Sequence, residues 1–393
     1  MPIAIFALFL GTLSIGTTEF MISGILPQIA SDLRVTIPEA GLLVTAYAIS
    51  VAVGGPVMAL ALARLPRKVA AIVLMGLFVV GHLIVGLSAN YFWAMLGRIV
   101  CAIGHGGFFG VAVVLATNIA PKERVGAALS LIFAGVTIAN IVGVPIGAAL
   151  GGAFGWRTPI WMVAVMAGIS LAAIIVIVPR TDTRSSAGGA LLAQFKVLAR
   201  QEVVTALSLI FLMMVAIWGF STFFVPYMTG VAGMPAGWIP IILLLSGIFS
   251  TIGIFLGGRL ADSYPTETMR FAYPTMAVLY VALFLIGPVN LWGAILVVGV
   301  LYLPITAVWT TTSNRALMAA KEAPDLTSTL LSSASNMGAA AGSWIAASAL
   351  TAGVAYSQLP LISVGAGLAA IAVAYLGLAM DRDRSLVNQP IRD

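Results

Sequence analysis

Charged residues are scarce in this chain of 393 residues, since only 8% are Asp, Glu, Lys or Arg while 61% are hydrophobic. Soluble domains carry about 25% charged residues. A chain this apolar could not keep its surface hydrated in water. The shortage of charge therefore excludes a soluble globular protein and predicts a chain that crosses a lipid bilayer many times.

Cysteine and histidine are nearly absent as well. Cys101 is the only cysteine, which excludes a disulfide framework and a thiolate metal cluster. The two histidines, His82 and His105, are not part of any group with metal-ligand spacing. The sequence also lacks a phosphate-binding Gly-Lys loop and a Ser-His-Asp grouping within an apolar stretch. We therefore expect no metal, no cofactor, no ATP drive and no enzymatic activity.

The net charge of +6 could suggest a nucleic-acid partner, but the basic residues lie in short loops between apolar stretches. Alternate loops and the tail carry almost all of them: Arg64, Arg67, Lys68, Lys122, Arg124, Arg180, Arg184, Lys196, Arg200, Arg259, Arg270, Lys321, Arg382 and Arg384. The other loops hold only Arg34 and Arg157. Because positive loops face the cytoplasm, we predict a multi-pass protein of the cell membrane with both termini cytoplasmic and no nucleic-acid partner.

Twelve apolar stretches follow one another, each long enough for a membrane-spanning helix, which needs about 20 residues. They lie at 3–28, 39–62, 69–88, 92–118, 126–150, 158–179, 203–229, 238–258, 270–287, 291–315, 328–351 and 360–380. The pattern predicts an all-α integral membrane protein with twelve transmembrane helices.

One long polar break, 180–202, separates two halves that repeat each other at an offset of 199 residues. We predict an N-terminal six-helix half (1–179), a cytoplasmic linker (180–202) and a C-terminal six-helix half with a short tail (203–393). The matched pairs include Pro27 with Pro226, Trp93 with Trp292, Lys122 with Lys321, and Gly143 with Gly342. Pseudo-symmetric six-span halves are a known transporter architecture, with the substrate site between them. The alternative is two unrelated helical bundles.

Glu19 is the only carboxylate inside an apolar stretch. A charge at that depth costs at least about 2.5 kcal/mol, and such residues usually line a polar pathway. Arg98, in the fourth stretch, is predicted to lie at the same depth, roughly 9–12 Å below the outer face at 1.5 Å per residue. The two charges could then stabilise each other, either for proton transfer or as a static ion pair.

His105 follows Arg98 by two helical turns on the same face, and its imidazole would suit a proton relay. Its glycine-rich surroundings equally favour simple close packing. We predict that Glu19, Arg98 and His105 couple transport to protons. His82 is interpreted as a packed or lipid-facing histidine.

The second half replaces these charges with apolar groups, since the offset of 199 pairs Glu19 with Trp218 and Arg98 with Val297. Pockets for apolar ligands are mostly aromatic and aliphatic, with a few polar groups. The predicted substrate-binding residues are Tyr47, Phe108, Phe109, Asn140, Trp218, Phe223, Phe224, Tyr227, Tyr302 and Trp309. The alternative is that this aromatic stripe faces lipid or packs against other helices.

The fifth stretch carries small residues every four positions, at Gly135, Gly143, Gly147 and Gly151. Such spacing lets another helix approach closely. Pro145 removes one intrahelical hydrogen bond and predicts a kink. Asn140 could form a hydrogen bond to a neighbouring helix. Taken alone, the pattern fits ordinary membrane packing as well as a mechanistic role.

The whole chain resembles the twelve-span drug:proton antiporters of the major facilitator superfamily, especially chloramphenicol-resistance and arabinose-efflux-permease-like proteins. Thr17-Thr18-Glu19-Phe20 and the following Gly24 to Leu33 are similar to that branch's first span. Arg98 with Gly104 resembles the family's fourth-span arginine motif, which implies proton coupling. Its fifth-span antiporter motif, which distinguishes exporters, is matched by Gly135, Gly143, Pro145 and Gly147.

The family's loop after span 2 usually reads Gly-x-x-x-Asp-Arg-x-Gly-Arg-Lys, and this chain departs from it. The glycine and aspartate positions are Ala59 and Ala63, while the repeated copy after span 8 keeps Gly258 and Asp262. The resemblance implies a cytoplasmic gate formed by Arg64, Arg67, Lys68, Gly258 and Asp262. The missing aspartate implies that the charge lock of this gate is altered, or that the arginines contact lipid instead.

The sequence therefore predicts a monomeric, proton-coupled exporter of small apolar or amphiphilic compounds such as antibiotics, working by alternating access. Its partners would be a small-molecule substrate, protons and the lipid bilayer. The main alternative is a proton-coupled transporter of a hydrophilic metabolite, such as a sugar or a nucleoside. A non-transporting membrane receptor and an integral membrane enzyme are weaker alternatives, because the chain has neither a large soluble domain nor a polar residue cluster.

Overall fold

The computed structural model describes residues 2–180 and 200–387, and every regular element in these two ranges is helical. The N-terminal half comprises α1 (Ile3–Gly24), α2 (Leu26–Leu33), α3 (Ile37–Ala61), α4 (Arg67–Gly86), α5 (Tyr91–Ile119), η1 (Lys122–Arg124), α6 (Val125–Ile138), the π-helical turn η2 (Ala139–Gly143), α7 (Val144–Phe154) and α8 (Arg157–Ile177).

The C-terminal half comprises α10 (Gln201–Ser221), α11 (Phe224–Gly230), η3 (Ala236–Trp238), α12 (Ile239–Ser263), α13 (Pro265–Ile286), α14 (Leu291–Ala319), α15 (Pro324–Thr351), η4 (Tyr356–Gln358) and α16 (Leu359–Val387). Most of the predicted linker, including Arg184 and Lys196, lies outside the described residues.

Among the described residues, eleven helical segments are long and apolar enough to span a membrane. The predicted stretch 328–351 falls on α15, which is not one of these eleven. It is less apolar because it is rich in serine, threonine and asparagine. Two of these hydroxyls serve the contact between the halves, since Ser343 and Ser333 donate hydrogen bonds to backbone carbonyls of α3.

The first span of each half is broken at the corresponding place. Pro27 lies in the first turn of α2, where its missing N–H ends the hydrogen-bond ladder of α1 at Gly24. Its counterpart Pro226 lies in the first turns of α11, directly after the end of α10 at Ser221. The fourth and tenth spans also correspond, because α5 and α14 both have 29 residues and begin with an asparagine cap. The internal repeat of the sequence thus reappears as a repeat of local structure.

Close helix contacts at glycine hold each half together. In the N-terminal half, α4 and α5 touch where Gly104 faces the backbone of Leu74 and Phe78. In the C-terminal half, α10 and α15 touch where Gly342 faces the backbone of Val215 and Gly219. Without a side chain at these points the two backbones of each pair approach closely enough for extensive van der Waals contact.

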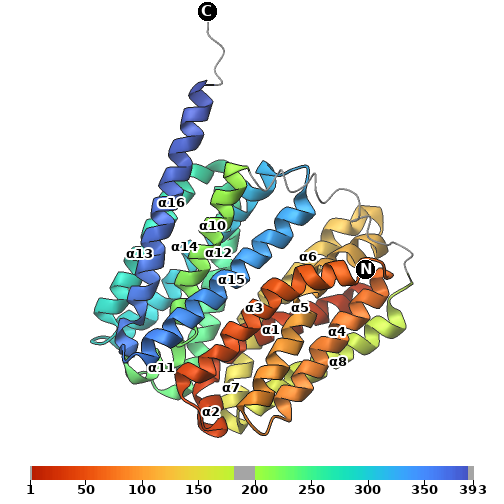
Figure 1. The fold of residues 1–393 in the computed structure, drawn as a ribbon, viewed down its shortest axis with the longest axis horizontal. Coiled ribbons are helices and arrows are strands. Elements are labelled where there is room, and N and C mark those ends of the chain that lie inside the picture. The colour runs from red at the N-terminus through yellow and green to blue at the C-terminus, as the bar shows by residue number, and fades with distance from the viewer. Residues whose placement is uncertain (1, 181–199, 388–393) are drawn as a thin grey trace, which may run out of the picture.

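The two ends of the molecule differ in charge. The basic end carries Arg64, Arg67, Lys122, Arg124, Arg200, Arg259 and Lys321, and the opposite end carries Arg34 and Arg157. The two halves lie side by side, and α2, α7 and α11 gather at the opposite end (Figure 1). The start of α1 and the end of α16 lie at the basic end (Figure 1).

The halves meet mainly toward the opposite end. There α11 contacts α1 and α2, and α12 packs against η2 and α7. The longest contact is between α3 and α15, where Ser343 Oγ donates to the carbonyl of Gly41 at 3.3 Å. Closer to the middle of these helices, Ser333 Oγ donates to the carbonyl of Ala52 at 3.2 Å.

Candidate functional site

Arg98 lies in the interior of the N-terminal half, with only 1% of its surface exposed. Its Nη1 donates to Thr18 Oγ1 at 3.3 Å, and its guanidinium carbon lies 3.9 Å from the ring centre of Tyr47. Both contacts are electrostatically favourable for a buried cation. The Nε and Nη2 groups have no hydrogen-bond partner. Arg98 is therefore held on one side and unpaired on the other.

Tyr47 extends this cluster toward His105. Its hydroxyl lies 2.9 Å from His105 Nδ1, and the tyrosine is buried whereas the histidine is half-buried. The structure thus connects α3 with α5 through one polar contact next to Arg98. Tyr47, predicted to bind substrate, is in this conformation a neighbour of the predicted proton-coupling residues.

The predicted partnership of Glu19 with Arg98 is electrostatic in this structure and not a direct ion pair. The two side chains interact electrostatically, as Glu19 also does with Tyr47, but they do not make an ion pair. In this conformation the guanidinium contacts Thr18 and the Tyr47 ring. Glu19 itself is half-buried, and the following residue, Phe20, is half-buried as well.

Phe20 and Trp218 form an aromatic stack across the two halves. Their ring centres lie 5.6 Å apart with an interplanar angle of 18°. Trp218, predicted to bind substrate, is 6% exposed. The residue that follows the half-buried acid in α1 is thus in direct contact with α10 of the other half.

Other predicted substrate-binding aromatics pack within or between the helices. Phe108 is completely buried, with its ring close to Gly11 of α1, which gives it a packing role in this conformation. Phe109 stacks edge-on against the exposed Phe133, at 5.3 Å between ring centres. Tyr227 is also fully buried and donates its hydroxyl to a carbonyl of α13.

Of the remaining predicted aromatics, one contacts the other half. Phe223 closely approaches Gly41 of α3, and so joins α3 to the break between α10 and α11. Phe224 is buried against Phe220. Tyr302 and Trp309 are half-buried on α14.

The predicted kink in the fifth span is a π-helical turn. Because Pro145 has no N–H, the regular hydrogen-bond ladder cannot continue, and five residues, Ala139–Gly143, adopt π geometry. Asn140, which could bond to a neighbouring helix, donates its Nδ2 to the carbonyl of Val136 in its own span at 3.1 Å. Gly247 of α12 packs against the backbone of this turn.

The spaced glycines of the fifth span all face α1. A side chain on Gly135, Gly143 or Gly147 would collide with Thr12, Thr17 or Met21, respectively. The predicted close approach therefore exists, and its partner is the helix that carries Glu19. Pro145 itself is buried in the first turn of α7.

The predicted gate residues do not join the two halves in this conformation. Arg64 is exposed, Arg67 is half-buried, and Lys68 Nζ donates to the carbonyl of Ile175 in its own half at 2.7 Å. Asp262 lines a cavity of about 530 Å³ at the basic end of the C-terminal half. Gly258, one turn earlier in α12, has no neighbour close to the position of an added side chain.

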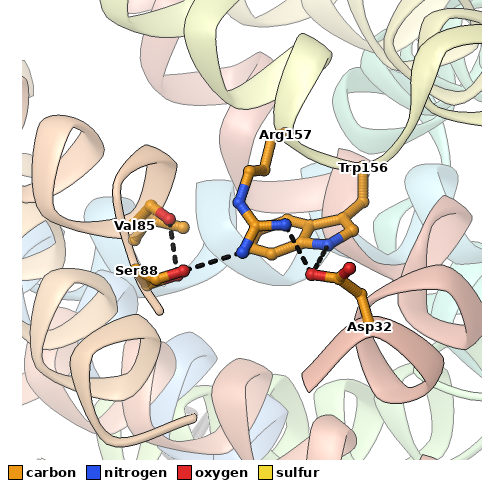
Figure 2. Close-up of polar contacts among 5 residues, drawn as sticks. All are labelled: Asp32, Val85, Ser88, Trp156 and Arg157. Carbon is orange, nitrogen blue, oxygen red and sulfur yellow. Dashed lines mark hydrogen bonds and ion pairs between the residues drawn. The ribbon is translucent and has the colours of Figure 1, made fainter. Parts of the chain in front are cut away.

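At the opposite end, Asp32 of α2 joins three segments of the N-terminal half (Figure 2). It accepts hydrogen bonds from Arg157 Nη1 and from Trp156 Nε1 at 3.1 Å. Arg157 Nη2 also donates to the carbonyl of Ser88 at 2.7 Å. The hydrogen bonds from Arg157 and Trp156 hold the pKa of Asp32 below its ordinary value. This cluster ties α2 to the α4–α5 turn and the start of α8.

His82 also belongs to the cluster around Arg98, although its sequence position did not indicate it. His82 is 1% exposed, and its Nε2 lies 2.9 Å from Thr18 Oγ1, the oxygen that also contacts Arg98. A lipid-facing position is therefore wrong, whereas the interpretation as a packed residue holds. A histidine inside an apolar stretch must find a polar partner, but the sequence does not say which.

Comparison with known proteins relates the whole chain to membrane transporters. A family model for the Major Facilitator Superfamily matches residues 8–347. The inner membrane transport protein YdhP of Escherichia coli is 33% identical over 368 residues, which cover 93% of this chain and 94% of YdhP. A chloramphenicol resistance protein of Streptomyces lividans is 33% identical over 355 residues, covering 89% of this chain and 90% of that protein.

Among solved structures, a variant of the nucleoside transporter NupG aligns with a TM-score of 0.76 and 13% identity over 96% of this chain and 99% of NupG. At that identity the likeness shows the fold alone. It confirms the predicted fold of two six-helix halves, and the family match confirms the resemblance stated above. The chain therefore belongs to the major facilitator superfamily of membrane transporters.

Proposed function

We propose that this protein is a proton-driven exporter of small apolar or amphiphilic compounds, such as antibiotics. The observation that carries this proposal is the position of Glu19. It is a half-buried acid in a membrane helix, within electrostatic reach of Arg98, a buried cation with an unpaired edge. An ionisable group kept in such surroundings is a candidate for picking up and releasing a proton.

In the proposed cycle, Glu19 releases its proton when substrate binds from the cytoplasm. It takes up a proton again when the protein opens outward, and this releases the substrate. By the positive-inside rule, the basic end and both termini face the cytoplasm. Contacts between the halves toward the opposite end fit the conformation that receives substrate from inside. We propose that one chain performs this cycle as a monomer.

An apolar substrate is supported by the aromatic residues where the two halves meet. Phe20, the residue after Glu19 in α1, stacks on Trp218 across the halves, and aromatic rings at this place suit an apolar substrate bound between the halves. The family relationship to a protein named for chloramphenicol resistance points to the same class of compound. Chloramphenicol is therefore the probe for the test.

The test is pH-driven uptake of radiolabelled chloramphenicol into inverted membrane vesicles. The variant Glu19→Gln keeps the size and polarity of the side chain but cannot titrate, and we expect it to abolish uptake driven by the pH gradient. Glu39→Gln is the matched control, because Glu39 is an exposed acid that caps α3, and glutamine also fits that role. Undiminished pH-driven uptake by Glu19→Gln would exclude Glu19 as the coupling site. Competition by arabinose or uridine in place of apolar drugs would favour a hydrophilic substrate.

A further inference from the structure

His82 makes two hydrogen bonds that together fix where its proton lies. Its Nδ1 is 2.8 Å from the carbonyl oxygen of Phe78, one turn earlier in α4. A carbonyl oxygen can only accept, so Nδ1 must carry the hydrogen. In the neutral imidazole the other nitrogen, Nε2, is then an acceptor, and it lies 2.9 Å from Thr18 Oγ1.

Because its hydrogen is used by His82, Thr18 can only accept a hydrogen bond from Arg98. Its oxygen accepts from Arg98 Nη1 at 3.3 Å, and its single hydrogen points to His82 Nε2. The donors therefore run in one direction, from Arg98 to Thr18, then to His82, and finally to the Phe78 carbonyl. All four residues are buried, and they belong to α5, α1 and α4. If His82 carried a second proton, its Nε2–H and the Nη1–H of Arg98 would both donate to Thr18 Oγ1, and two positive charges would face each other.

This chain of hydrogen bonds leaves one edge of the guanidinium unused. Arg98 Nε and Nη2, which share that edge, have no partner although the residue is 1% exposed. Two parallel N–H groups of this kind fit the two oxygens of a carboxylate. Leaving them unpaired is unfavourable in a buried site, so a carboxylate that came within reach would bind there. A candidate is Glu19, whose charge already interacts with Arg98.

We propose that His82 is a positioning residue for proton coupling, which acts through Thr18 to hold Arg98 with its Nε–Nη2 edge open to the Glu19 carboxylate. The proposal rests on the proposed function, since it assigns the orientation of Arg98 to the same proton-coupling site. The ionisable groups around the guanidinium are Glu19 on α1, Tyr47 on α3, His82 on α4, and Cys101 and His105 on α5.

The experiment compares variants that differ in one hydrogen bond. His82→Leu removes the acceptor for Thr18 and puts an apolar side chain of similar size in its place. His82→Gln restores an acceptor at the place of Nε2 without a titratable ring. Thr18→Val removes the hydroxyl with little change of shape. Thr268→Val is the matched control, because Thr268 is a buried threonine on α13 whose hydroxyl donates only to its own helix.

Two chloramphenicol assays in vesicles separate coupling from folding. The first measures uptake driven by a pH gradient, and the second measures exchange of internal for external chloramphenicol without a gradient. We expect His82→Leu and Thr18→Val to lose pH-driven uptake roughly tenfold or more, because Thr18→Val removes a hydrogen bond to the Arg98 cation and His82→Leu removes the acceptor that orients this hydroxyl. Exchange should stay within about twofold of the wild type, because it needs a folded protein that binds chloramphenicol but no proton coupling. A roughly tenfold loss of exchange would instead indicate that binding or packing is damaged.

His82→Gln should recover most of the pH-driven uptake, and Thr268→Val should resemble the wild type in both assays. Combining His82→Leu with Thr18→Val should cause no further loss, because both act on one interaction. Equal loss of uptake and exchange in His82→Leu, without recovery in His82→Gln, would show a merely structural histidine and overturn the proposal. Normal pH-driven uptake in His82→Leu, together with its loss in Glu19→Gln, would overturn this proposal alone. Normal uptake in Glu19→Gln would overturn the proposed function and this inference with it.

Discussion

Gly143→Ala adds one methyl group at the place where the π-helical turn lies against α1. The new carbon would be 3.2 Å from both Cβ and Cγ2 of Thr17, and closer still to its Oγ1. Ordinary van der Waals contacts of such a carbon lie at 3.4–4 Å. Thr17 is completely buried, and its hydroxyl is held by the carbonyl of Leu13 at 2.8 Å. The threonine therefore cannot rotate away without losing a hydrogen bond, and the helices must separate.

The expected cost follows from this forced separation. Inserting a methyl group into a well-packed interior typically costs about 1–3 kcal/mol, and we expect the free energy of unfolding to fall by that amount. Alanine favours a helix over glycine by up to about 1 kcal/mol, which offsets part of the loss. The net effect should lie in the lower half of the range.

The assay is reversible unfolding of the purified protein in mixed detergent micelles. Gly152→Ala is the control, because Gly152 lies on α7 nine residues later and an added carbon there meets open space. The double variant Thr17→Ala, Gly143→Ala lacks the colliding Oγ1 and Cγ2. It should recover at least about half of the stability that Gly143→Ala alone loses, if the two sites are coupled. Equal stability of Gly143→Ala and Gly152→Ala would refute the close approach. Failure of Thr17→Ala to restore any stability would refute Thr17 as its cause.

Two further predictions concern the N-terminal half. Because hydrogen bonds from Arg157 lower the pKa of Asp32 in the folded state, the stability from its charge is present above the ordinary value of 3.8 and is lost as the pH falls through the lowered folded value. Asp32→Asn should therefore reduce the free energy of unfolding at neutral pH by no more than about 1 kcal/mol, since the Asp32–Arg157 pair is partly exposed. In unfolding curves recorded at decreasing pH, the stability difference between wild type and variant should vanish. A stability difference that grows as the pH falls below 3.8 would contradict this reasoning. Gly81→Ala should prevent accumulation of folded protein, measured by size-exclusion chromatography, because an added carbon would overlap the backbone of Cys101. Gly76→Ala on the same helix meets open space and should accumulate normally.

The membrane spans and the repeat could be predicted from the sequence because both depend on local composition. Apolar stretches of sufficient length must form helices in lipid, and a proline, which has no N–H, can interrupt a helix, although Pro56, Pro274 and Pro304 lie inside continuous helices. The break after Gly24 and the π-helical turn before Pro145 both follow from this rule. The glycines at four-residue spacing indicated a close helix neighbour, and the structure adds that this neighbour is α1.

The partners of the buried polar groups could not be predicted in the same way. Equal depth in the membrane predicted that Glu19 and Arg98 stabilise each other, and their charges do interact, but equal depth does not predict which groups bond directly to the guanidinium. The guanidinium instead contacts Thr18 and Tyr47, which come from two other helices. His82 was passed over for the same reason, because no local pattern links it to a threonine 64 positions away.

The sequence by itself determined that the chain is a membrane protein of two similar six-helix halves with a single acid inside a span. These properties depend on the transfer of apolar side chains from water to lipid and on the backbone hydrogen bonds of each segment, which are local. Only the tertiary structure decided that His82, Thr18, Arg98 and Tyr47 form one cluster and that Phe20 meets Trp218 across the halves. A buried polar group must bond to whatever the packed neighbouring helices present, and that choice is made by the rotation and contact of whole helices.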